Sequence, residues 1–213
     1  VHVLRALRPA PVWRELGQQC VQQHVGLHAN AANTTSLSTL RRQQEATAET
    51  TTAKRSYKYV ALHARIELEM MAHKCGQDME MNLTKIIDQV QELAASVSST
   101  RSDDDIIHSQ NVRCLFVAVS RSSMQEGGNL YREFQAYADD NIQTLNRLVR
   151  DGATAENPLQ VFECGENMLQ EYYQEHPDVP DHGSLLQSVI NFDIAVNADI
   201  FVGVRKSSYS TDV

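Results

Sequence analysis

A nearly continuous apolar run, VRCLFVAVS at residues 112–120, constrains the fold of this chain more than any other segment. A strand with one face in water alternates apolar and polar residues, whereas this run carries apolar side chains on both faces and includes several β-branched residues. Such a strand needs a layer of helices on each side of its sheet. The run therefore predicts a central strand of a parallel sheet.

Shorter strand candidates and helical segments alternate along the rest of the chain. The strand candidates lie at residues 57–63, 159–162 and 199–204. Apolar residues recur at three- and four-residue steps, as in amphipathic helices, at 9–25, 83–97, 130–149, 166–175 and 184–198. In the segment 130–149, Phe134, Tyr137 and Leu145 fall on the apolar side. This order predicts βαβ crossovers and an α/β fold with a doubly wound parallel sheet.

The composition divides the chain into three parts. Residues 1–26 form a lead-in helix, and residues 27–56, rich in Ala, Thr, Ser, Asn and Gln, form a low-complexity surface insertion or linker. Residues 57–213 form the doubly wound, Rossmann-like domain. The chain opens with Val1 and its last residues, SSYSTDV, read as the entry to another element. We therefore expect an internal piece of a longer protein, with the domain incomplete at its C-terminus.

Charge and hydropathy exclude two classes of protein. A formal net charge of −8 and a pI near 5.4 argue against bulk nucleic-acid binding, which needs clustered Lys and Arg. No apolar run approaches the roughly 20 residues of a membrane-spanning helix. A locally held anionic small ligand is compatible with both observations.

Four cysteines are spaced too widely for a CxxC-type zinc or redox motif, at Cys20, Cys75, Cys114 and Cys164. They allow three disulfide pairings, between which the sequence does not choose. His73 and Cys75 lack the spacing and the further ligands that a zinc site requires, so we expect no bound metal ion.

Two Asn-x-Thr triplets begin at Asn33 and Asn82. Such a triplet permits N-glycosylation in a secretory compartment. Asn82 equally suits the N-cap of the helix that follows it.

The first group of candidate site residues follows the strand at 57–63. His63 ends this strand and Arg65 comes two residues later, where the carboxyl ends of parallel strands bind ligands. A guanidinium presents a planar fork of donors that matches phosphate oxygens, so the residue type favours an anion. Two alternatives stay open: His63 is a satisfied core histidine, and Arg65 pairs with Glu67 or Glu69.

The second group follows the strand at 199–204. Gly203 allows close backbone approach, and Ser207, Ser208 and Tyr209 come just after it. Small hydroxyls and backbone amides beyond a strand form a phosphate cradle if a helix begins there. The alternative is that Ser207 or Ser208 only caps a helix.

Asp193 shares a helix face with Leu186 and Ile190, which turns its carboxylate towards the sheet. A buried carboxylate must be paired or hydrogen-bonded, so we expect a structural role with backbone amides or a basic partner. The chain has no GxSxG, Walker or glycine-rich dinucleotide motif.

Read together, the two groups resemble the GDP-fucose protein O-fucosyltransferase family. HARIELEMMAHKCG at 63–76 is similar to the plant-type pattern His-x-Arg-x-Glu-x-Asp-Met, with Glu69 in place of Asp. DIAVNADIFVGVRKSSYS at 193–210 is similar to the family's second donor-binding segment. The resemblance covers residues 57–213 and implies the carboxyl-terminal, donor-binding domain of a GT-B fold.

The resemblance also implies roles for particular residues. Arg65 would bind the diphosphate and stabilise the charge that grows on leaving GDP. His63 would line the donor pocket, while Ser207, Ser208 and Tyr209 would cradle the phosphates. Structural residues near this site would be Asp193, Asp199 and Gly203.

The reaction implied by the resemblance is inverting, metal-independent fucosyl transfer from GDP-fucose to a protein or glycan hydroxyl. Its partners would be GDP-fucose, the acceptor and an amino-terminal Rossmann-like domain of the same protein, without which residues 1–213 are not a competent enzyme. The compartment would be the endoplasmic reticulum or Golgi lumen. The alternatives are a silent relative that binds a nucleotide sugar or a protein, and an unrelated doubly wound domain.

Overall fold

A four-stranded, all-parallel sheet forms the centre of the protein. The computed structural model describes residues 10–30, 59–72, 80–99, 112–125, 131–154, 158–164, 166–178 and 184–203. The strands are β1 (Tyr59–His63), β2 (Cys114–Ala118), β3 (Gln160–Phe162) and β4 (Ile200–Val202), and their order in the sheet is β3-β2-β1-β4. Each neighbouring pair is parallel. The predicted α/β fold with a parallel sheet is confirmed, and this architecture is compatible with a Rossmann-like domain.

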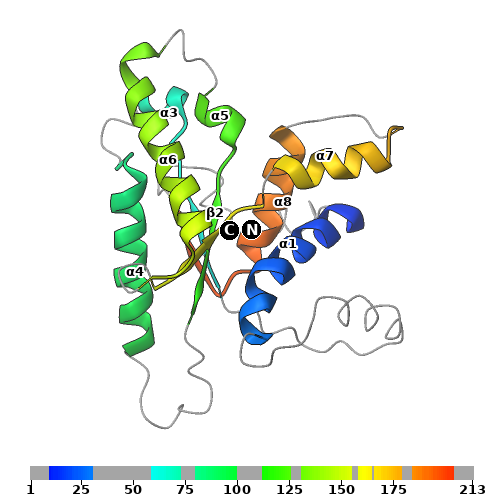
Figure 1. Ribbon diagram of the computed structural model, residues 1–213, viewed down its shortest axis with the longest axis horizontal. Coiled ribbons are helices and arrows are strands. Elements are labelled where there is room, and N and C mark those ends of the chain that lie inside the picture. The colour runs from blue at the N-terminus through cyan, green and yellow to red at the C-terminus, as the bar shows by residue number, and fades with distance from the viewer. Residues whose placement is uncertain are drawn as a thin grey trace, which may run out of the picture.

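Helices cover both faces of this sheet. They are α1 (Pro11–Asn30), α3 (Leu68–Ala72), α4 (Leu83–Ser99), α5 (Arg121–Gln125), α6 (Gln135–Asp151), α7 (Glu166–Glu175) and α8 (Ser184–Val196), with a 3₁₀ turn, η4, at Arg132–Phe134. Figure 1 shows α4 and α6 on one side of the strands and α1, α7 and α8 on the other. In the described ranges, no helix has both the length and the apolar character needed to cross a membrane.

The strands build one hydrophobic core on each face. All five residues of β1 and all five of β2 are buried, as expected for central strands. Because side chains alternate across a strand, Val60 and Leu62 pack towards α4 and α6, whereas Tyr59 and Ala61 pack towards α1 and α8. The apolar run at 112–120 is therefore buried on both of its faces.

Helix α1 packs against α7 and α8, although it precedes all four strands of the described sheet. The Trp13 ring lies edge-on to Tyr172, with 5.1 Å between ring centroids. At Gly17 a Cβ atom would lie 3.3 Å from Cγ1 of Ile194, so glycine permits the close approach of the two helices. An added Cβ atom at Gly17 would require the Ile194 side chain to shift by a few tenths of an ångström.

A disulfide joins α1 to Cys164, two positions beyond the end of β3. Cys20 and Cys164 are bonded, with Cα atoms 5.8 Å apart and 144 positions between them in sequence. Cys114 is a free, buried thiol whose pKa is raised by burial. Cys75 lies outside the described residues. The structure thus forms the Cys20–Cys164 bridge, but because Cys114 is free it does not complete the pairing that would also join Cys75 to Cys114.

Asn82 caps α4, as one of the two sequence interpretations proposes. Its Oδ1 accepts a hydrogen bond from the Lys85 amide at 3.1 Å, and its carbonyl accepts from the Ile86 amide at 3.1 Å. We expect Asn82→Ala to lower the free energy of unfolding by about 1 kcal/mol, and Asn82→Asp to keep the capping acceptor. Urea titrations of both variants measure this, and equal losses in the two would contradict the capping role.

Candidate functional site

The strand order reverses between β1 and β4. From β1 the chain moves to β2 and then β3 on one side, and it returns to place β4 on the other side of β1. Open α/β sheets bind ligands outside the carboxyl ends of the strands at such a reversal. Leu62 pairs with Val202, so continuing this register sets Gly203 beside His63. His63 and Gly203, one from each of the two groups of candidate residues, therefore lie side by side at the carboxyl edge of the sheet.

His63 is the last residue of β1 and is 8% exposed. Burial, with a smaller contribution from the Arg65 charge, lowers the pKa of its imidazole from 6.5 to about 4. At neutral pH the ring is therefore uncharged, with one nitrogen able to donate a hydrogen bond and the other able to accept one.

The depressed pKa of His63 predicts a pH-dependent stability. Between pH 6.5 and about 4 the unfolded chain binds a proton at His63 that the folded chain excludes, so stability falls as the pH falls. The slope from this residue is at most about 1.4 kcal/mol per pH unit. Urea unfolding across this window should show that His63→Gln removes part of the slope. Identical slopes in both proteins would contradict the assignment.

Arg65 lies between β1 and α3 and contacts Glu67. Its Nε lies 3.2 Å from Oε2 of Glu67, and the side chains are 28% and 23% exposed. Arg65 therefore forms an ion pair with Glu67, which was one of the alternatives that the sequence left open. An ion pair that solvent reaches stabilises a protein by less than about 1 kcal/mol, so it is weak enough for a diphosphate to compete with it.

Arg121 is a second guanidinium at the same edge, and the sequence analysis missed it. It opens α5, three positions beyond β2, as Arg65 lies two positions beyond β1. Its Nε donates to Oε1 of Glu163 at 2.8 Å, its Nη2 contacts the same oxygen, and its Nη1 donates to Oδ1 of Asn146 at 2.7 Å. Arg121 therefore braces the ends of β2 and β3 against α6. A basic residue just past a buried strand was the signal that could have revealed it.

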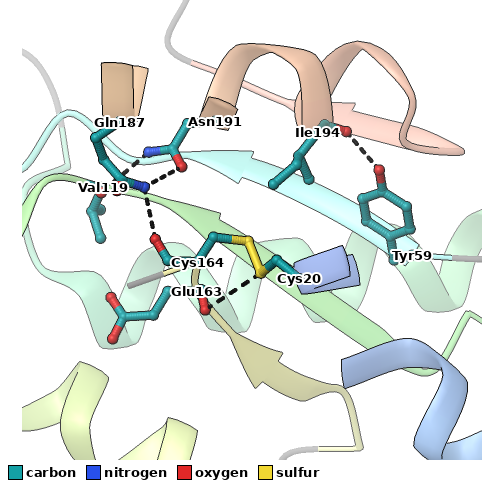
Figure 2. The surroundings of a disulfide bond; sticks show 8 residues. All are labelled: Cys20, Tyr59, Val119, Glu163, Cys164, Gln187, Asn191 and Ile194. Carbon is teal, nitrogen blue, oxygen red and sulfur yellow. Dashed lines mark hydrogen bonds between the residues drawn. A yellow bond between two sulfur atoms is a disulfide. The ribbon is translucent and has the colours of Figure 1, made fainter. Parts of the chain in front are cut away.

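A buried amide network supports this edge from the other face. In Figure 2, Nε2 of Gln187 donates to the Cys164 carbonyl at 2.7 Å and to Oδ1 of Asn191 at 2.9 Å. Nδ2 of Asn191 then donates to the Val119 carbonyl at 3.3 Å. Helix α8 is thereby fixed to the carboxyl ends of β2 and β3, directly beside the Cys20–Cys164 disulfide.

Two of the predicted residues lie at the opposite edge of the sheet. Asp199 precedes β4, and its Oδ2 accepts from the Tyr59 amide at 3.0 Å at the start of β1. Five strand residues separate this point from the carboxyl edge by roughly 13 Å. Asp193 is buried in the last turn of α8; burial raises the pKa of its carboxyl, and the Arg14 charge opposes this. The Asp199 carboxylate ties the start of β4 to the start of β1, and both Asp residues lie away from His63.

Gly203, exposed just past β4, does lie at the carboxyl edge, whereas Ser207, Ser208 and Tyr209 fall outside the described residues. Within the described ranges, no three His, Cys, Asp or Glu side chains gather as a metal site would require.

Comparison of the chain with family models, with curated proteins and with solved structures finds no match.

Proposed function

We propose that this chain is the donor-binding domain of a GDP-fucose-dependent O-fucosyltransferase with a GT-B architecture. One observation carries the proposal: His63 ends β1 and Arg65 follows it, and Gly203 follows β4, at the point where the strand order reverses. The two sequence motifs that resemble the family, at 63–76 and 193–210, include these two strand ends.

In this proposal the diphosphate of GDP-fucose displaces Glu67 from Arg65. A phosphate oxygen pair matches the guanidinium fork better than one carboxylate oxygen does, and it carries more charge. The acceptor hydroxyl attacks the anomeric carbon of fucose as the bond to GDP breaks, with inversion, and the hydroxyl proton passes to solvent. Arg65 stabilises the charge that develops on the departing diphosphate, which is an electrostatic contribution to the transition state.

His63 contributes a neutral hydrogen-bonding group beside that cation. A protonated imidazole next to Arg65 would repel it, and the low pKa keeps the ring uncharged. The ring can then bind a phosphate or sugar oxygen of the donor. Arg121 and the Gln187 network keep the surrounding strand ends rigid, which favours a preorganised site.

The proposal includes a second Rossmann-like domain, amino-terminal to these residues, that supplies the acceptor side. It also places the protein in the lumen of the endoplasmic reticulum or Golgi. The Cys20–Cys164 disulfide supports this compartment, because such bonds persist where the environment is oxidising.

A second candidate is a silent relative that binds a nucleotide sugar or a protein. Two observations favour it: Arg65 is already paired with Glu67, and Glu69 stands where the plant-type pattern has Asp. This candidate predicts binding of GDP without turnover.

Calorimetric titration of GDP, GMP and UDP into the 213-residue chain tests the proposal. We expect GDP to bind, GMP to bind at least tenfold more weakly because it lacks the second phosphate, and chelators to leave the GDP affinity unchanged. UDP keeps the diphosphate and changes the base, so its affinity relative to that of GDP measures the selectivity for guanine. Failure of GDP to bind a folded chain would overturn the proposal and also the nucleotide-sugar-binding form of the second candidate.

A further inference from the structure

The triplet Asn82-Leu83-Thr84 is a chemical motif that the proposed function does not use. It has the form Asn-x-Thr with an x other than proline, which is the acceptor sequence for N-linked oligosaccharides. The triplet lies at the start of α4, in the described part of the chain. Its geometry can therefore be examined atom by atom.

The two side-chain atoms of Asn82 have different environments. Oδ1 accepts the capping hydrogen bond from the Lys85 amide at 3.1 Å. Within the described residues, Nδ2 makes no hydrogen bond and is not buried. An N-linked sugar is attached to Nδ2 and leaves Oδ1 unchanged. Helix capping and glycosylation therefore use different atoms of this side chain and are compatible.

Asn141 of α6 fixes the backbone on either side of Asn82. Its Oδ1 accepts from the Leu83 amide at 2.9 Å, and its Nδ2 donates to the Met81 carbonyl at 2.8 Å. Asn141 is 1% exposed, so these contacts lie on the inner side of the segment. The backbone on either side of Asn82 is hydrogen-bonded from within the protein, and Asn82 itself is only partly buried.

The compartment required for this modification agrees with the covalent structure. Oligosaccharide transfer to asparagine takes place in the lumen that also forms disulfides, and Cys20 and Cys164 are bonded. This second observation is independent of fucosyl transfer.

We propose that Asn82 carries an N-linked oligosaccharide. Nδ2 forms a bond to the anomeric carbon of an oligosaccharide carried on a polyprenyl diphosphate, and the bond between that carbon and the diphosphate breaks. The diphosphate leaves with the electron pair, and one amide proton passes to a base of the transferase. The product is a secondary amide that keeps Oδ1 as the capping acceptor of α4.

Peptide mapping of the protein purified from its own cells tests this directly. Treatment with a peptide N-glycosidase in ¹⁸O-water converts a glycosylated asparagine into ¹⁸O-labelled aspartate. We expect the label at residue 82, in a peptide distinct from the one that contains Asn33. An Asn82 peptide that is found only unmodified would overturn the proposal.

Two variants separate the modification from the cap. Asn82→Asp keeps an oxygen acceptor for the Lys85 amide but offers no amide nitrogen, and Thr84→Ala keeps Asn82 and removes the hydroxyl that the transferase requires. When either is expressed through the secretory pathway, we expect it to lose one glycan relative to the unsubstituted chain and to keep its fold. An electrophoretic mobility unchanged in both variants would overturn the proposal.

Discussion

Replacing Arg65 by alanine is expected to reduce fucosyl transfer by about 2–4 kcal/mol of transition-state stabilisation, comparable to the loss of a preorganised oxyanion donor. The effect follows from the position of Arg65 just past the carboxyl end of β1, the strand that pairs with β4. The measurement is kcat/KM with GDP-fucose, on a protein that includes the amino-terminal half that we propose.

Two control variants separate binding of the diphosphate from loss of the ion pair or of charge. Glu67→Gln breaks the same ion pair but leaves the guanidinium in place, so we expect transfer within a few-fold of the unsubstituted protein. Arg150→Ala removes an equal charge from an exposed side chain near the end of α6 and should have no effect. If Glu67→Gln loses as much activity as Arg65→Ala, the ion pair alone is important and Arg65 does not act on the donor.

Reduction of the Cys20–Cys164 disulfide should lower the free energy of unfolding by about 5 kcal/mol, from the loop-closure entropy of a 144-residue separation. The bond tethers α1 to the carboxyl end of β3, so its loss also frees the helix that covers α8. Urea denaturation with and without a thiol reductant measures the change.

The matched control is the double variant Cys20→Ala with Cys164→Ala. We expect its stability to be low and insensitive to the reductant, whereas Cys114→Ala should keep the full response because that thiol is free. A midpoint of the unsubstituted chain that does not move on reduction would contradict the tethering role.

The sequence predicted most helices from their three- and four-residue apolar period, and it predicted the strands from short apolar runs between the helical segments. The interval 166–175 coincides with α7, and the apolar run at 112–120 contains β2. The helical period was a less reliable guide to which individual side chains are buried. Tyr137, assigned to the apolar side of its helix, is 58% exposed, while Asn141 on α6 is buried. A hydrogen-bonded amide can occupy a core position, and hydropathy does not register such partners.

The site was predicted in part for a similar reason. His63 and Arg65 were found because they follow a recognisable strand, and the pairing of β4 with β1 was implied only by the order of elements. Asp199 was expected near the site, but the sequence does not reveal that its carboxylate reaches the amide of Tyr59 at the far edge. Arg121 and the Gln187 network depend on contacts between distant segments, which no local pattern encodes.

The central claim, that Arg65 and the hydroxyls after β4 bind one diphosphate, is tested most directly by a double-mutant cycle of GDP affinity. The cycle compares the unsubstituted chain, Arg65→Ala, Ser207→Ala with Ser208→Ala, and the combination of all three. Groups that share a ligand are predicted to couple by at least about 0.5 kcal/mol. Losses of affinity that simply add would show that the two segments do not meet at a common phosphate group.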